Sequence, residues 1–256
     1  MQDLASRIHN FSVSEGSLGI IYLGQAGFIL KDSNGKLVAI DLYLSDCVER
    51  YDGFKRLMPK LLCPNDLVYD IIITTHAHYD HFDIDAVPLM MENEQTILLA
   101  AYDCKVECEK YHVNPGRTIY LREGDNYTLD DINITAVFCD HGVNTPDAIG
   151  LLIEIGGKRV YVAGDTSLHL DEGMKIAKEN VDVMIVPING AFGNLNEMDA
   201  VSLCEVVQPK LVIPCHYWCF AEHGGNPLLF INELNSKLPS QNYLIMRMGD
   251  ICCLNG

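Results

Sequence analysis

The chain of 256 residues carries 18 Lys and Arg against 35 Asp and Glu, so its formal charge is −17 at neutral pH. Because the basic residues are few and scattered, extended binding to nucleic acid or to an anionic membrane surface is not expected. Hydrophobic residues make up 48% of the chain, yet no apolar stretch approaches the roughly 20 residues that span a bilayer. The composition indicates a globular protein of one large α/β domain or two small ones.

The N-terminal segment and the cysteines point to a reducing compartment. Residues 1–7 show neither a basic start nor an apolar core, so we expect no secretory signal. Ten cysteines occur, many of them inside apolar segments, and the chain is too long and too regular for a disulfide scaffold. We therefore expect reduced thiols and a cytoplasmic location.

The first half of the chain alternates short apolar runs with turn residues. Ser33-Asn34-Gly35 is typical of a hairpin turn, and Asp83 can cap a following helix. A further helix is predicted at Asp103 to Tyr111. The predicted strands are Gly19 to Leu23, Phe28 to Lys31, Leu37 to Asp41, Asp70 to Thr74 and Thr96 to Ala101.

The second half alternates predicted strands with predicted helices. The strands are Ile132 to Cys139, Ile149 to Ile155, Arg159 to Ala163, Val183 to Pro187 and Leu211 to Pro214, with strand character again from Tyr243 to Leu254. The helices are Asp171 to Glu179, Asn196 to Val207 and Asn226 to Lys237. No linker or repeat interrupts this order. We predict a single α/β domain over residues 1–256, with two packed sheets and helices outside.

Residues that bind metals recur where predicted strands end. The segment after the strand at 70–74 contains His76, His78, Asp80 and His81 within six positions. A folded core could not easily satisfy three imidazoles and a carboxylate in one place, so this cluster predicts a metal site. Later strands end at His141, Asp165 and His216.

These seven residues suggest a site for two divalent cations. His76 and His78 can reach one ion, which His141 would complete, while Asp80 and His81 turn towards a second ion with His216. Asp165 is the candidate bridging carboxylate, and the neighbouring Gly164 allows a close backbone approach. Mixed imidazole and carboxylate ligands suit zinc, manganese or iron. Because Asp140 precedes His141 at a strand end, only one of the two is expected to face the ions.

The motifs together resemble the metallo-β-lactamase superfamily. They are His76-x-His78-x-Asp80-His81, a later histidine, Gly164-Asp165-Thr166 and Ile213-Pro214-x-His216. Within that superfamily the chain is most similar to the L-ascorbate-6-phosphate lactonases. The resemblance implies a four-layer αββα sandwich, two Mn²⁺ or Zn²⁺ ions as cofactors, and hydrolysis of a small-molecule substrate.

The mechanism we expect is attack by a metal-bound hydroxide on a lactone or a related ester of a small substrate, with phosphorylated and sugar-derived molecules among the candidates. Asp80 would orient the water and carry its proton to the leaving group. Two alternatives stay open: a phosphodiesterase or N-acyl phospholipid hydrolase using the same ions, and a metal-binding module without catalysis.

Three further residues are candidates for supporting the ions or contacting the substrate. Asp41 ends a strand and can hold a metal-binding histidine by a hydrogen bond. Asn189 and His223 lie in loops that follow later strands, and either could be a connecting-loop residue instead. The sequence leaves open whether the chain forms a homo-oligomer.

Overall fold

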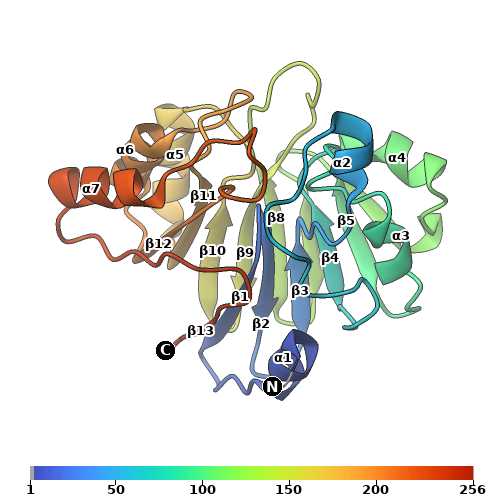
Figure 1. Cartoon of the computed structure of the whole chain (residues 1–256). Coiled ribbons are helices and arrows are strands. Elements are labelled where there is room, and N and C mark those ends of the chain that lie inside the picture. Colours follow the sequence, from blue (N-terminus) through green and yellow to red (C-terminus); the bar gives the residue numbers. More distant parts are fainter. Residues whose placement is uncertain (1–2, 256) are drawn as a thin grey trace.

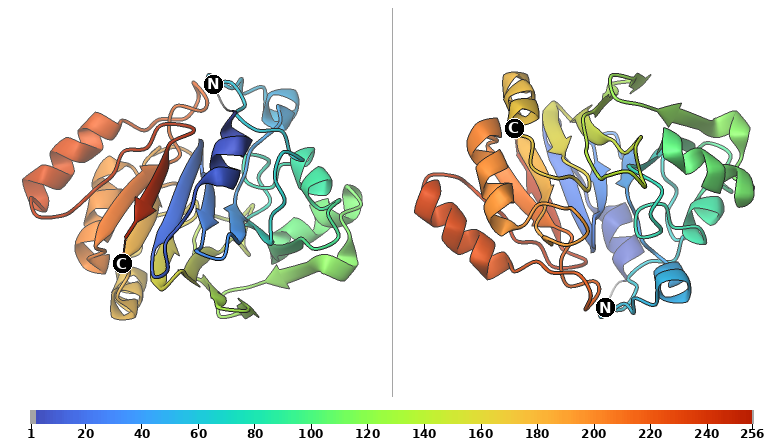
Figure 2. Two further views of the ribbon diagram at one scale, coloured as in Figure 1. Left: turned by 90° about the horizontal axis from the view of Figure 1, so that it is seen from below. Right: turned by 90° about the horizontal axis from the view of Figure 1, so that it is seen from above.

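A computed structural model describes residues 3–255 of the chain. Within these residues two β-sheets pack against each other, one of seven strands in the order β13-β1-β2-β3-β4-β5-β6 and one of six in the order β12-β11-β10-β9-β8-β7. Helices lie on the outer side of each sheet (Figure 1). Seen from below or from above, the molecule shows four layers in the order helices, sheet, sheet, helices (Figure 2). The predicted αββα sandwich is confirmed.

The first sheet begins with antiparallel strands and continues with parallel ones. β3, β4, β5 and β6 are parallel neighbours. Apolar runs such as Ile71-Ile72-Ile73 form its centre, because parallel strands are covered on both faces. Its strands are β1 (Leu18–Gly24), β2 (Gly27–Lys31), β3 (Leu37–Ile40), β4 (Ile71–Thr74), β5 (Ile97–Ala101), β6 (Thr118–Leu121) and β13 (Ile251–Leu254).

The second sheet has the same mixture of pairings. β10, β11 and β12 run parallel, whereas β7 to β10 are antiparallel neighbours. In β8 buried positions alternate with more exposed ones, as in a strand with one solvated face. Its strands are β7 (Asn126–Leu129), β8 (Ile132–Val137), β9 (Gly150–Ile155), β10 (Lys158–Val162), β11 (Val183–Pro187) and β12 (Leu211–Cys215).

Each helical layer belongs to one sheet. One hydrophobic cluster joins the two sheets, and a second lies between the outer face of the second sheet and its helices. Beside the first sheet lie α2 (Cys47–Asp52), α3 (Ala86–Met90) and α4 (Lys105–Lys110), and beside the second lie α5 (Leu170–Ile176), α6 (Glu197–Val207) and α7 (Pro227–Lys237) (Figure 1). The remaining helices are α1 (Leu4–Asn10) and the 3₁₀ turns η1 (Tyr102–Cys104), η2 (Pro115–Arg117) and η3 (Ala177–Glu179).

Local sequence signals explain where several helices begin. Asn196 accepts hydrogen bonds from the first turn of α6, and Asp199 bonds back to the Asn196 amide in a capping box. Asn226 caps α7, with Pro227 at its first position. Asp83 accepts the amide of Ala86 at the start of α3, as predicted.

Most predicted elements form within a residue or two of their expected ends, with four omissions and one error. Sequence patterns did not indicate α1, α2, β6 or β7. The expected strand from Tyr243 to Leu254 is wrong for most of its length, because only Ile251–Leu254 pairs with β1 and Tyr243 makes an isolated bridge to Val212. Short elements of this kind depend on tertiary contacts more than on local propensity.

Two further properties concern the chain as a whole. All ten cysteines lie within the described residues, and none of them is paired with another, as expected. No helix among residues 3–255 combines the length and the apolar character that crossing a membrane requires.

Candidate metal centre

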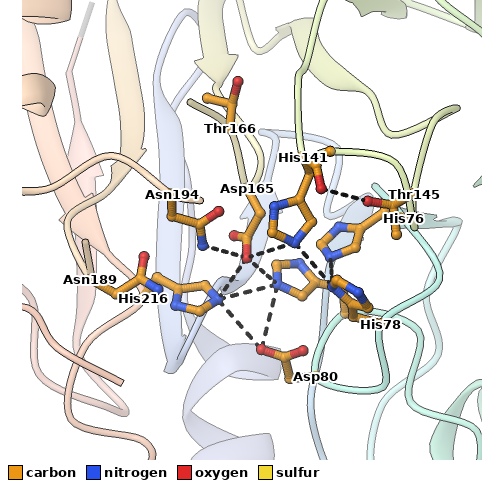
Figure 3. Close-up of polar contacts among 12 residues, drawn as sticks. His76, His78, Asp80, His141, Thr145, Asp165, Thr166, Asn189, Asn194 and His216 are labelled. Atoms are coloured by element: carbon orange, nitrogen blue, oxygen red, sulfur yellow. Dashed lines mark hydrogen bonds and ion pairs between the residues drawn. The ribbon is translucent and has the colours of Figure 1, made fainter. Parts of the chain in front are cut away.

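The seven predicted metal ligands converge at one edge of the sandwich. Figure 3 labels all of them except His81. β8, β10 and β12 run in the same direction within their sheet, so the loops that follow them meet at one end. His141, Asp165 and His216 come from these three loops. The other four follow β4 of the facing sheet: His76, His78, Asp80 and His81.

Three imidazoles form the first group, which we call the imidazole triad: His76, His78 and His141. The Nδ1 atom of His78 lies 3.0 Å from Nε2 of His76 and 3.0 Å from Nε2 of His141. These three nitrogens lie close enough together to hold one ion. The sequence left open whether Asp140 or His141 faces this point. It is His141, because the Asp140 carboxylate bonds to Ser167 and His169 instead.

Two carboxylates and two imidazoles form the second group, the mixed tetrad: Asp80, His81, Asp165 and His216. The Nε2 atoms of His81 and His216 are 3.3 Å apart. Oδ2 of Asp165 lies 3.4 and 3.1 Å from them, and Oδ2 of Asp80 lies 3.6 and 3.4 Å from them. Each of the two carboxylate oxygens therefore lies within 3.6 Å of both imidazole nitrogens.

Asp165 lies between the two groups. Its Oδ2 atom is 3.8 Å from Nε2 of His141 in the triad, in addition to its contacts in the tetrad. Asn194 holds this oxygen by a 2.7 Å hydrogen bond from Nδ2. The preceding Gly164 has φ +69°, and a Cβ atom there would come within 3.0 Å of the carbonyl oxygen of Ile149. A glycine at 164 thus lets Asp165 reach the position of a bridging ligand.

The donor atoms match what divalent cations require. A tetrahedral ion bound at about 2.1 Å separates its ligands by roughly 3.4 Å, close to the spacing within both groups. Three neutral imidazole nitrogens that face one another cannot all be satisfied by hydrogen bonds among themselves, since each ring has one N–H. Five imidazoles with two carboxylates suit zinc, manganese or iron better than calcium or magnesium.

The two groups differ in charge in the absence of cations. Burial lowers the pKa of His76 and of His141, the latter to about 4, so the triad is neutral at pH 7. In the tetrad burial also lowers the pKa of His216, but the charge of Asp165 and the hydrogen bonds that His216 donates to both carboxylates outweigh it and raise the value to about 9. The pKa of His81 is likewise raised well above its usual value.

Three of the non-glycine residues with positive φ lie around the tetrad. His216 has φ +61°, Asp41 has φ +47° and Gln25 has φ +53°, values that side-chain-bearing residues seldom adopt. The amide of His216 donates to the carbonyl of Gln25 at 2.7 Å, which ties two of these residues together. Such strain persists only where surrounding contacts enforce it, and it commonly marks functional sites.

Asp41 is placed as the sequence suggested, behind a histidine of the tetrad. Its Oδ2 atom lies 2.9 Å from Nδ1 of His81, on the far side of the ring from the tetrad. The same carboxylate accepts the amide and the hydroxyl of Thr75, at 2.8 and 2.6 Å. This contact holds the His81 ring in one orientation and one tautomer, as carboxylates behind metal-bound histidines do.

The two loop candidates have different positions. His223 stacks on His216 with ring centroids 5.0 Å apart, and it forms a possible ligand group with Asp80 and His216. Burial lowers the pKa of His223 to about 4. Asn189, in contrast, is buried and donates to the carbonyl of Ala191. Its loop neighbour Asn194, which sequence reasoning did not single out, is the amide that contacts Asp165.

Gln25 is a second residue that sequence reasoning missed. It is buried in the turn between β1 and β2, and its Nε2 atom donates to Oδ2 of Asp80 at 2.7 Å. The same atom lies 2.9 Å from Nδ1 of His223. In the sequence, Gln25 stands between Gly24 and Gly27 and indicates a turn. Its contact with Asp80, 55 positions later, is visible only in the folded chain.

A cavity of about 920 Å³ opens above both groups, within the size range of small-molecule sites. His78, Asp80, His141, Asp165 and His216 form its floor. Its walls come from α2 and the segment after it, from α4, from the β4 loop and from the loops after β8, β11 and β12: Val48, Tyr51, Asp52, Phe54, Ala77, Tyr79, Glu107, Asn144, Thr145, Phe192, Asn194 and His223.

Comparison with known proteins gives a consistent result. A family model described as a beta-lactamase superfamily domain matches residues 19–216, a range that contains both groups of ligands. A UPF0173 metal-dependent hydrolase of Saccharolobus solfataricus is 33% identical over 203 residues, which cover 77% of this chain and 82% of that protein. A relative of the same description from Thermus thermophilus is 28% identical over 205 residues, covering 78% and 83%.

Solved structures share the fold at lower identity. Igni18, described as a metallo hydrolase of Ignicoccus hospitalis, superposes with a TM-score of 0.77 at 22% identity and covers 94% of this chain and 99% of that one. An isothiocyanate hydrolase from Delia radicum gut bacteria gives a TM-score of 0.74 at 16% identity, covering 93% and 100%. Similarity at this level concerns the arrangement of the sandwich alone.

Proposed function

Because the chain belongs to the beta-lactamase superfamily and is related to its UPF0173 metal-dependent hydrolases, we propose that it hydrolyses a lactone or a related ester of a small molecule. The cofactors we propose are two divalent cations, Mn²⁺ or Zn²⁺, one held by the imidazole triad and one by the mixed tetrad. We further propose that the chain works as one hydrolase domain, because both sheets contribute to one hydrophobic core.

One observation carries the proposal. Seven donor side chains from four loops point at one another, and five of them form the floor of a cavity large enough for a small substrate, with Asp165 Oδ2 within 3.8 Å of both groups. A purely structural cluster would not need to leave Asp80, His141 and Asp165 facing an open cavity. The donor set and the access for a substrate therefore both favour catalysis over simple metal storage.

The chain's own contribution centres on Asp80. Divalent cations, when bound, lower the pKa of water and polarise a carbonyl or phosphoryl oxygen. The Asp80 carboxylate faces the cavity, and the amide of Gln25 fixes one of its oxygens. Burial would raise the pKa of Asp80, but the charge of His81 and contacts with His216 hold it well below the usual value. An ionised Asp80 can accept a proton from the attacking water and pass it to the leaving alcohol.

His223 and Asn194 are the residues that we propose for orienting the substrate. Both line the cavity beside the tetrad. His223 is neutral at pH 7, because its pKa is lowered to about 4, and so it can exchange a hydrogen bond with a carbonyl or ring oxygen without adding charge.

The proposal is tested by metal analysis and by a substrate panel on protein purified without chelator. We expect two equivalents of Mn²⁺ or Zn²⁺ per chain, turnover of lactones or simple esters, and loss of that turnover after chelation with recovery on adding metal. Hydrolysis of bis(4-nitrophenyl) phosphate alone would favour a phosphodiesterase. Full metal occupancy without any turnover would contradict the proposal and favour a binding module.

A further inference from the structure

From the cavity walls we infer that this protein selects uncharged, hydrophobic substrates and rejects those carrying an anionic group away from the bond that is broken. This inference rests on the proposed function, since it concerns the substrate of the same site. It narrows the substrate class from lactones and esters in general to those whose remaining part is an alkyl or aromatic group without phosphate or carboxylate.

Aromatic rings form one wall of the cavity. Phe54 and Phe192 pack together with centroids 5.9 Å apart, and both contact the ring of His223 at 5.8 and 5.3 Å. Phe192 keeps 60% of its surface exposed, although it stands beside the metal centre. An exposed phenyl group at this place gains stability when a hydrophobic ligand covers it.

A second apolar surface comes from α2 and the β4 loop. Tyr51 and Tyr79 meet edge to face with centroids 5.1 Å apart, and Val48 and Ala77 line the cavity next to them. Tyr51 is 55% exposed. The walls above the ligand floor are therefore built largely from apolar side chains, on which an acyl or alkyl group can rest.

The charged residues of the walls are acidic. Among the described residues that line the cavity, the ionisable wall groups apart from histidine and tyrosine are Asp52 and Glu107, and Lys and Arg are absent. Two basic side chains close to the walls already have partners. Lys110 pairs with the wall residue Glu107 at 3.3 Å, and Arg56 donates to the carbonyls of Tyr43 and Ser45. The described walls thus present no free basic side chain to an anion.

Bound cations do not remove this selectivity for groups that lie against the walls. Two divalent ions would carry four positive charges against the two negative charges of Asp80 and Asp165, so the floor attracts the polar atoms of the bond that is broken, whereas Asp52 and Glu107 give the walls a negative charge. Proteins bind phosphate or carboxylate through guanidinium groups, ammonium groups or clustered amides. An anionic group placed against these walls would lose its hydration without gaining such a partner, which disfavours binding.

A matched pair of substrates tests the inference on the metal-loaded protein. One is γ-decalactone, and the other has the same ring with a side chain of equal length that ends in a carboxylate. We expect kcat/KM to be at least about tenfold higher for the uncharged lactone, a difference that corresponds to roughly 1.4 kcal/mol. Equal values, or faster turnover of the charged lactone, would overturn the inference while leaving the proposed function intact.

Variants of the two wall features sharpen the test. Phe192→Ala should lower kcat/KM for γ-decalactone about three- to tenfold and leave γ-butyrolactone, which has no side chain, within about twofold. Leu228→Ala is the matched control, because Leu228 is equally exposed but lies on α7. Asp52→Lys should raise kcat/KM for the charged lactone several-fold, and the gain should shrink at high salt.

Binding measurements separate the failure of this inference from the failure of the proposed function. Asp80→Asn is expected to bind lactones without turning them over, so calorimetry with this variant compares the two lactones directly. If the wild-type protein hydrolyses neither but Asp80→Asn binds the uncharged one more tightly, the proposed function fails and the cavity preference stands. Tighter or equal binding of the charged lactone would refute the preference.

Discussion

The imidazole triad and the mixed tetrad lie side by side, with Asp165 of the tetrad 3.8 Å from His141 of the triad, yet they differ in electrostatic character. In the triad burial keeps the rings neutral, with the pKa of His141 at about 4. In the tetrad two carboxylates raise the pKa of His216 to about 9 and retain its proton at pH 7. A cation entering the triad meets free nitrogen lone pairs, whereas one entering the tetrad must displace protons. The difference implies that the two sites fill in order and respond to pH in different ways.

The largest effect is expected from Asp165→Asn, which changes the residue of the tetrad that also approaches the triad. Removing the charge weakens the tetrad directly and the triad through His141. We expect metal content to fall from two equivalents to one or fewer, and turnover to fall more than about 10⁴-fold, towards the uncatalysed rate. Elemental analysis and initial rates measure both. Retention of two ions with near-normal turnover would show that Asp165 does not bridge the groups.

Asp80→Asn should reduce turnover about 10²- to 10⁴-fold, the usual contribution of a general acid or base. Metal content should fall much less, because His81, Asp165 and His216 still supply three ligands to the tetrad. Asp140→Asn is the matched control, since Asp140 ends a neighbouring strand but bonds to Ser167 and His169 away from the ions. Activity that survives in Asp80→Asn would remove Asp80 from the mechanism.

Asp41→Asn should weaken binding of the tetrad ion about 10- to 100-fold, because the His81 ring loses the carboxylate that fixes its tautomer. The triad ion should be affected little, which makes the variant a test of the separation between the groups. Competition with a chelator measures both affinities. Asp32→Asn provides the comparison, as Asp32 is an equally buried carboxylate in the turn after β2. Equal losses in both variants would indicate a general effect on folding.

The smallest effect concerns the stability of the metal-free protein. The tetrad should make stability fall as pH rises, and the triad should make it fall as pH drops. The folded-state pKa of His216 is raised, so its stabilisation is full below about pH 6.5 and is lost as pH rises to about 9. The folded-state pKa of His141 is depressed, so its contribution is present above about pH 6.5 and is lost as pH falls towards 4.

Thermal unfolding across this range checks both signs, at roughly 2–4 °C per kcal/mol for a chain of this size. The decline between pH 6.5 and 9 should shrink in His216→Asn, where His81 with its raised pKa still contributes, and should disappear in metal-loaded protein, whereas His141→Asn should keep it. A decline that is unchanged in His216→Asn would assign it to other groups.

Much of the site could be predicted because its residues stand where strands end. His76, His78, Asp80 and His81 form a cluster that is conspicuous in the sequence, and parallel strands bring their carboxyl ends to one edge. That rule led from the cluster to His141, Asp165 and His216, and from the end of β3 to Asp41. All of them lie at the same edge in the folded chain.

Other parts of the site could not be identified from local sequence patterns. Gln25 and Asn194 are single amides in turns, and Asn189 was an equally reasonable choice from the same loop as Asn194. The helix α2, which carries Val48, Tyr51 and Asp52 into the cavity wall, is only six residues long and was not predicted. Short helices and single side chains acquire their roles from what packs against them, and that information is distributed over the whole chain.

The amino-acid sequence by itself determined the kind of chemistry, because imidazoles and carboxylates placed after apolar strands have few other uses. Tertiary structure alone decided how these ligands divide into a neutral and a charged group, which amide supports Asp80, and what covers the ions. The physical reason is that charge, burial and hydrogen bonding depend on distances between segments that are remote in the chain. Local sequence patterns indicate helices, strands and the residues that follow them, but they do not give those distances.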